Sequence, residues 1–101
     1  MENPYMYLFI REDLSHPQQI VQTAHAVDEL NKKHPHPAGN YMVLCGASGE
    51  EELQSIAEML YNSGIGYEMF FEPDIDAFTA IATHPLWGEQ RKPLKRFKLK
   101  K

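Results

Sequence analysis

Residues 5–26 read YMYLFIREDLSHPQQIVQTAHA, and this stretch decides the fold. Its first part, Tyr5 to Arg11, is apolar at almost every position, which is typical of a strand covered on both faces of a sheet. A polar connection follows, in which Asp13 or Ser15 is suited to cap a helix that has Pro17 at its first position. The stretch therefore predicts a strand, a loop and a helix. In open α/β sheets, ligands bind at such a loop, at the carboxyl end of a strand.

The helix should continue to about Lys33, because the segment from His34 to Gly39 contains two prolines that end any helix. Apolar residues with helical spacing define the side of this helix that we expect to face the core. These residues are Ile20, Val21, Ala24, Val27 and Leu30.

The rest of the chain alternates in the same way. We expect strands at about Tyr41 to Cys45, Gly66 to Phe71 and Ala77 to Ala82. A second helix should begin after the capping-box pattern Ser48-Gly49-Glu50-Glu51 and end at a C-terminal cap formed by Gly64. The residues of this helix that we expect to be buried are Leu53, Ile56, Ala57 and Leu60. Helical crossovers make the first three strands parallel, whereas the short turn at residues 72–76 allows only an antiparallel return. The prediction is a single α/β domain of order βαβαββ, a mixed four-stranded sheet with helices packed on it and the last strand antiparallel.

Composition limits the class of protein. A chain of 101 residues with 43% apolar and 24% charged residues is typical of one small globular domain. No apolar run approaches bilayer length, and the start Met1-Glu2-Asn3-Pro4 lacks the pattern of a secretion signal, so we expect a cytoplasmic protein with no membrane partner. The single Cys45 lies in an apolar strand, which favours an inert buried thiol over a nucleophile.

Charge is divided unevenly along the chain. The first 90 residues carry a net charge of −11 with neutral histidines, and residues 91–101 carry +7. We therefore divide the chain into a domain at 1–90 and a basic C-terminal tail at 91–101. Such a tail suits a polyanionic partner such as nucleic acid, although basic ends also serve only solubility or fold back on an acidic surface.

Polar residues on the first helix form the candidate site. Gln18, Gln22 and His25 lie on one side of this helix, whose free amides and positive dipole end point to the carboxyl edge of the sheet. The alternative is that Gln22 and His25 are ordinary polar residues of a helix flank, with His25 hydrogen-bonded to Asp28 or Glu29.

An acid after the third strand should reach the same edge. Asp74 could orient or deprotonate water there, while glutamine or histidine donors steady an oxyanion. Asp76 competes for this role, and either aspartate could instead serve only the turn. Thr79 at the start of the fourth strand could bind a substrate oxygen, or could simply favour a strand.

Other combinations of residues are weaker. His34 and His36, with His16 or His84, supply no convincing third metal ligand, and no nucleotide-binding or paired-cysteine motif is present. We therefore expect neither a metal nor a cofactor. Trp87 beside the basic tail could stack on bases or pack against the domain.

Together these residues resemble the type 2 peptidyl-tRNA hydrolases, especially a branch of short bacterial and phage-type relatives. The resemblance covers most of the chain and rests on Gln-x-Ala-His-Ala at residues 22–26, on Arg11-Glu12-Asp13-Leu14-Ser15, on the His36-Pro37 loop, and on Glu72-Pro73-Asp74 followed by Thr79-Ala80-Ile81-Ala82. It implies a compact α/β domain that hydrolyses the ester joining a peptide to the 3′ ribose of tRNA, without a cofactor, and it makes a homodimer plausible.

The resemblance assigns roles residue by residue. Gln22 and His25 match the helix motif, Asp74 the acidic residue after the third strand, and Thr79 the threonine that follows. Many members have Gly-Lys where this chain has Pro17-Gln18, so a neutral Gln18 replaces the lysine usually assigned to the active site. In the resulting hypothesis Asp74 activates water, Gln18 and Gln22 donate hydrogen bonds, His25 organises the helix face, and tail cations such as Lys92, Lys95 and Arg96 bind phosphates.

Two other functions stay open. The chain could be a non-catalytic module that binds tRNA or another nucleic acid on the same fold, because the lysine is missing. It could also be a small regulatory or assembly protein whose basic tail only aids solubility.

Overall fold

The computed structural model describes residues 3–36 and 39–100. Met1 and Glu2 of the chain start, Pro37 and Ala38 of the predicted loop, and Lys101 of the basic tail lie outside the described residues. Within the described ranges, no helix combines the length and the apolar character needed to cross a bilayer.

The predicted α/β architecture is confirmed. The elements follow the order β1 (Tyr5–Arg11), α1 (His16–Lys33), β2 (Tyr41–Ala47), α2 (Glu50–Asn62), β3 (Tyr67–Glu72), the 3-10 helix η1 (Pro73–Ile75), β4 (Ala77–Thr83) and the 3-10 helix η2 (Gly88–Leu94). They build one four-stranded mixed sheet in the order β2-β1-β4-β3. β1 pairs in parallel with β2, and β4 lies antiparallel to both β1 and β3, so the last strand has the predicted direction.

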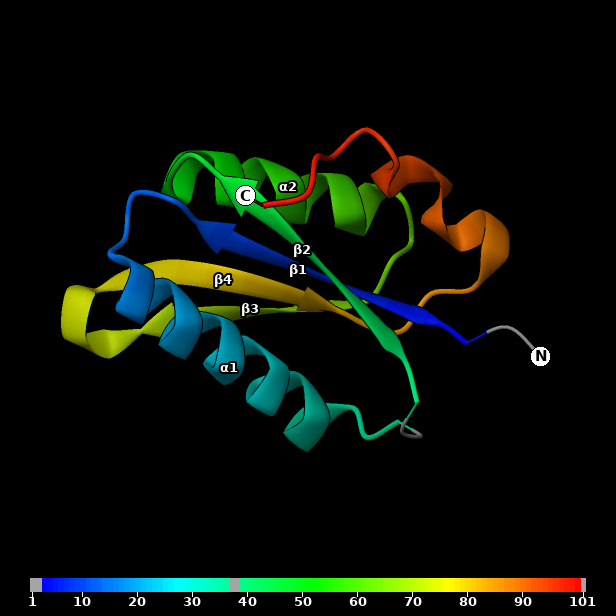
Figure 1. Ribbon diagram of the computed structural model, residues 1–101, viewed down its shortest axis with the longest axis horizontal. Helices are drawn as coiled ribbons and strands as arrows, with labels where there is room; N and C mark the ends of the chain where they lie inside the picture. Colours follow the sequence, from blue (N-terminus) through cyan, green and yellow to red (C-terminus); the bar gives the residue numbers. More distant parts are fainter. Residues whose placement is uncertain (1–2, 37–38, 101) are drawn as a thin grey trace.

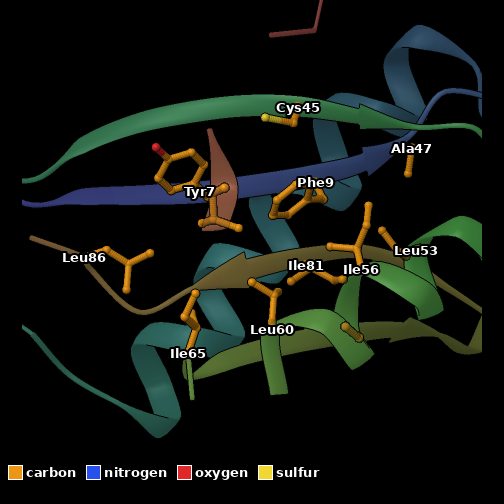
Figure 2. Packing of buried hydrophobic residues seen from close by; sticks show 12 residues of the cluster. Tyr7, Phe9, Cys45, Ala47, Leu53, Ile56, Leu60, Ile65, Ile81 and Leu86 are labelled. Atoms are coloured by element: carbon orange, nitrogen blue, oxygen red, sulfur yellow. The ribbon is translucent and has the colours of Figure 1, made fainter. Parts of the chain in front are cut away.

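β1 lies inside the sheet and is covered on both faces (Figure 1). Met6, Leu8 and Ile10 pack toward α1, in a cluster with Ala26 and Leu30. The alternate residues of β1 point to the other face, where they meet α2 in the larger cluster (Figure 2), made of Tyr7, Phe9, Cys45, Leu53, Ile56, Leu60, Ile81 and others. β1 is apolar at almost every position because α1 covers one face of the sheet and α2 covers the other.

The first turn of α1 is defined by a capping box. Ser15 is the N-cap, so the open choice between Asp13 and Ser15 is decided, and the helix begins at His16 with Pro17 one position later than predicted. The backbone N–H of Gln18 donates to Ser15 Oγ, and the backbone N–H of Ser15 donates to Gln18 Oε1. Two backbone donors of the helix start are thereby satisfied.

The predicted buried side of α1 is wrong in its first half. Ile20 is 72% exposed and Val21 is 49% exposed, whereas Gln19 and Gln22 are buried together with Ala26 and Leu30. The helix lies mainly over β4 and β3, which turns the 19-22-26-30 side toward the sheet. The spacing of apolar residues alone could not reveal this, because the buried glutamines depend on partners elsewhere in the chain.

The predicted capping box of α2 is also wrong. The N-cap is Gly49, without a side-chain cap bond, and the N–H of Ser48 instead donates to the carboxylate of Glu52. Three glutamates in the first turn, at residues 50–52, stabilise the helix because their negative charges lie near the positive end of its dipole. At the other end, Gly64 with φ of +71° follows the C-cap Ser63.

The C-terminal residues fold onto the α2 side of the sheet (Figure 1). η2 contributes the fully buried Leu94 to the larger cluster, and Phe97 packs edge-on against Phe9 with 5.1 Å between ring centroids. The sequence left open whether this basic segment only aids solubility or folds back on the domain, and the structure makes it part of the core.

Candidate functional site

A small hollow lies where the start of α1 meets η1. Its volume is about 140 Å³, and its lining consists of Leu14, Gln18, Gln22, Glu72, Asp74 and Ile75. The hollow is at the carboxyl ends of β1 and β3, the edge at which the sequence predicts a site. Three of the predicted residues, Gln18, Gln22 and Asp74, therefore share one location.

Gln22 is the best-fixed polar group of the hollow. The hydroxyl of Thr79 donates to Gln22 Oε1 at 2.7 Å, and Gln22 Nε2 donates to Glu72 Oε1 at 2.7 Å. Gln22 is 6% exposed and Thr79 is fully buried. An ionised carboxylate only accepts hydrogen bonds, so Glu72 requires the NH₂ side of the amide and Thr79 receives the oxygen side. The orientation of the amide is thereby determined.

Gln18 is held by the capping box. Its Oε1 accepts from both the N–H and the hydroxyl of Ser15, each at 3.1 Å. Among the described residues these bonds engage only the oxygen end of the Gln18 amide, so the Nε2 end is left to donate to a ligand. This position of the hollow therefore carries an oriented neutral donor.

Gln19 supports the loop behind the hollow. Its Nε2 donates to the carbonyl of Leu14 at 2.8 Å and, at 3.5 Å, to that of Glu12. A buried amide that satisfies loop carbonyls ties the β1–α1 connection to the helix. We did not predict this role, although Gln19 lies three residues before Gln22 on the same side of the helix.

Two carboxylates line the hollow. Asp74 lies exposed on η1, and Glu72 ends β3 and is partly buried. Sequence reasoning missed Glu72, although it follows the same strand as Asp74. Asp76, the predicted competitor, is the C-cap of η1 with φ of 52° and is not part of the lining.

An ion pair stiffens the β1–α1 loop. Arg11 donates two hydrogen bonds to Asp13, at 2.9 and 2.8 Å, and a third to the carbonyl of Phe78 at 3.1 Å. The hydrogen bonds to Arg11 lower the pKa of Asp13, and those to Asp13 raise the pKa of Arg11. The loop that carries Leu14 and Ser15 is thereby fastened to β4.

His25 takes a different position from the one predicted for a site residue. Its ring stacks on Phe70 of β3, with 4.9 Å between centroids and 14° between planes, and it lies outside the hollow. This contact holds the exposed flank of α1 on β3. His25 therefore supports the helix that carries Gln18 and Gln22.

The predicted phosphate-binding cations lie at the other end of the sheet (Figure 1). Lys92 is on η2 and pairs with Glu89 at 3.3 Å, and Lys95 and Arg96 are exposed just beyond it. The segment is joined to the start of β1 by reciprocal hydrogen bonds between Tyr5 and Leu86. Among the described residues, no lysine or arginine lines the hollow.

Three histidines gather near the end of α1. The rings of His34 and His84 lie 4.5 Å apart, and burial, followed by the charges of His34 and His36, lowers the pKa of His84. Within residues 3–36 and 39–100, no group of three or more His, Cys, Asp or Glu side chains is arranged to hold a metal ion. Cys45 is buried, and this burial raises its pKa, which disfavours the reactive thiolate.

Comparison with known proteins identifies the fold and nothing further. No family model matches the chain, and no curated protein sequence is significantly similar to it. Among solved structures, the chain is similar to the protein of unknown function Atu0240 from Agrobacterium tumefaciens strain C58, with 18% sequence identity, full coverage of both chains and a TM-score of 0.70.

Proposed function

We propose that this protein hydrolyses an ester bond of peptidyl-tRNA or of a related aminoacyl-tRNA and releases free tRNA. One observation carries the proposal: Asp74 and the amides of Gln18 and Gln22 meet in a single hollow. A carboxylate can act as the general base, and fixed amide donors can stabilise the oxyanion, when water hydrolyses an ester. The proposal places the protein in the cytoplasm, and the homodimer stays a prediction.

Each group has a defined role in this reaction. Asp74 takes a proton from water as the water oxygen attacks the ester carbonyl, and the negative charge passes to the carbonyl oxygen. The Nε2 donors of Gln18 and Gln22 stabilise this oxyanion. When the intermediate collapses, the ester C–O bond breaks and the ribose oxygen takes the proton from Asp74, giving a free acid and a free hydroxyl.

The charge of the hollow supports an ester rather than a phosphate as the reacting group. Glu72 and Asp74 both line it, and no lysine or arginine of the described residues does. Two carboxylates repel a phosphate, whereas an ester is neutral until the transition state is reached. A neutral carbonyl therefore suits this hollow better than an anionic ligand does.

The test is release of peptide from purified peptidyl-tRNA by the full chain. Asp74→Asn should lower kcat by about 10²- to 10⁴-fold, the usual contribution of a general base. Asp76→Asn is the matched control, because it removes the same charge two residues away, outside the hollow, and asparagine tolerates left-handed backbone. Absence of turnover by the wild type, or equal activity of the Asp74 variant, would remove the enzymatic proposal.

A non-catalytic tRNA-binding module is the second candidate, and the lack of a cation at the hollow favours it. A neutral donor stabilises an oxyanion less than a charged one does, by about 1–2 kcal/mol or a factor of roughly 10 in rate. Salt-sensitive binding of tRNA without any turnover would support this candidate.

A further inference from the structure

The C-terminal residues 86–100, which we term the strap, form an anchored basic surface. The strap begins at Leu86, which pairs with Tyr5, and runs through η2 to the outer edge of β2 (Figure 1). There Leu99 forms a bridge with Cys45, and the N–H of Lys100 donates to the carbonyl of Leu44 at 2.8 Å. The strap thus crosses the molecule from the amino end of β1 to the edge strand.

Specific side chains fix the strap on the domain. The guanidinium of Arg91 lies 3.4 Å from the centre of the Tyr5 ring and donates to the hydroxyl of Tyr7 at 3.0 Å. Leu94 is fully buried, and Phe97 packs on Phe9. A tail that only aids solubility needs none of these contacts. Their effect is to hold the intervening cations in place.

The cations between these anchors face solvent. Lys92, Lys95, Arg96 and Lys98 are all exposed. Among the described residues, Lys95, Arg96 and Lys98 have no carboxylate partner, and Lys92 pairs only with the exposed Glu89. The acidic remainder of the chain leaves the strap as the surface that attracts a polyanion.

An aromatic residue at the start of the strap narrows the class of polyanion. Trp87 is 50% exposed and directly precedes η2. Fixed cations and an exposed aromatic ring on one anchored segment are a combination that binds single-stranded nucleic acid, by phosphate contacts and base stacking. An acidic polypeptide or an anionic membrane would use the cations but gains nothing from a stacking surface.

We infer that the strap binds a single-stranded segment of nucleic acid, with phosphates on Lys95, Arg96 and Lys98 and a base on Trp87. The inference deepens the proposed function by naming a surface that holds the polynucleotide and that lies outside the lining of the hollow. It concerns binding alone and is measured without hydrolysis. The binding assay can therefore fail while the hydrolysis assay succeeds, or the reverse, so the two proposals are tested independently.

The sole tryptophan of the chain provides the assay. Titration of the full chain with a single-stranded RNA of about 12 nucleotides should quench Trp87 fluorescence, and affinity should fall steeply between about 50 and 200 mM salt. Lys95→Gln/Lys98→Gln should weaken binding about tenfold at low salt and reduce the slope of log K against log salt by about 1.4, which corresponds to two lost contacts. Urea unfolding of this variant should match the wild type.

Lys32→Gln/Lys33→Gln is the matched control, since it removes the same two charges from exposed positions on α1. Its RNA affinity should stay within about twofold of the wild type. Equal weakening by both double variants would overturn the inference, because only net charge would then matter. Competition by polyglutamate or anionic vesicles as strong as that by RNA, or no quenching at low salt, would overturn it as well.

Discussion

The buried pair of Thr79 and Gln22 gives the sharpest test of the site geometry. Thr79→Val keeps the shape of the side chain but removes the hydroxyl that donates to Gln22 Oε1 at 2.7 Å. The amide oxygen then remains buried without its donor, which costs about 1–3 kcal/mol. For a domain of this size, each kcal/mol lowers Tm by about 4–8 °C. Urea and thermal unfolding both measure the loss.

A double-mutant cycle separates this hydrogen bond from simple packing. In a Gln22→Met background no amide oxygen is left unsatisfied, so Thr79→Val should cost less than about 0.5 kcal/mol there. Thr79→Ser is the control that keeps the hydroxyl and loses one methyl, at about 1 kcal/mol. If Thr79→Val costs the same in both backgrounds, the hydrogen bond does not orient Gln22 and the site geometry is refuted.

Three further predictions concern the ends of the sheet. The pKa of His84 is lowered in the folded protein, so the unfolded chain binds the proton first as the pH falls. The contribution of neutral His84 to the free energy of unfolding is therefore fully present above the ordinary pKa of 6.5 and is lost as the pH falls below it. His84→Gln should flatten the decline of the urea midpoint in this pH range, and an unchanged slope would contradict the assignment. Arg91→Gln should lower the free energy of unfolding by about 1–2 kcal/mol and speed hydrogen exchange within the strap, because it removes the contact with the Tyr5 ring and the hydrogen bond to Tyr7. The control Lys92→Gln, at an exposed position, should lower the free energy of unfolding by less than about 0.5 kcal/mol. Leu94→Ala should cost about 2–5 kcal/mol in chemical unfolding, since this side chain is fully buried, and a neutral result would show that the strap is not part of the core.

The directions of the strands could be predicted because they depend on local signals. The apolar run of β1 requires cover on both faces, and the lengths of the connections decide which strands run parallel. The turn at residues 72–76 left only an antiparallel return. These features are properties of neighbouring residues, so they are visible in the sequence.

The buried side of α1 could not be predicted in the same way. Burial of Gln22 requires Thr79 and Glu72, which are 57 and 50 residues away along the chain. Gln19 requires loop carbonyls that exist only after the loop has closed. From neighbouring residues alone, Ile20 is a better candidate for burial than Gln19 or Gln22. Hydrogen bonds to distant residues bury the two glutamines instead. The contacts that hold the strap could not be predicted for the same reason, because Arg91 and Tyr7 are 84 residues apart.

Under the proposed function, the site and the strap divide the two chemical demands of a polynucleotide ester. Its phosphates carry full charges and need cations, whereas its ester carbonyl is neutral and needs oriented donors. A lysine placed beside Glu72 and Asp74 would pair with them and draw phosphates into the hollow. Neutral Gln18, held by Ser15, offers a donor without this effect. Cations fixed on the strap, outside the lining of the hollow, can then bind the backbone without competing for the carboxylate that we propose activates water.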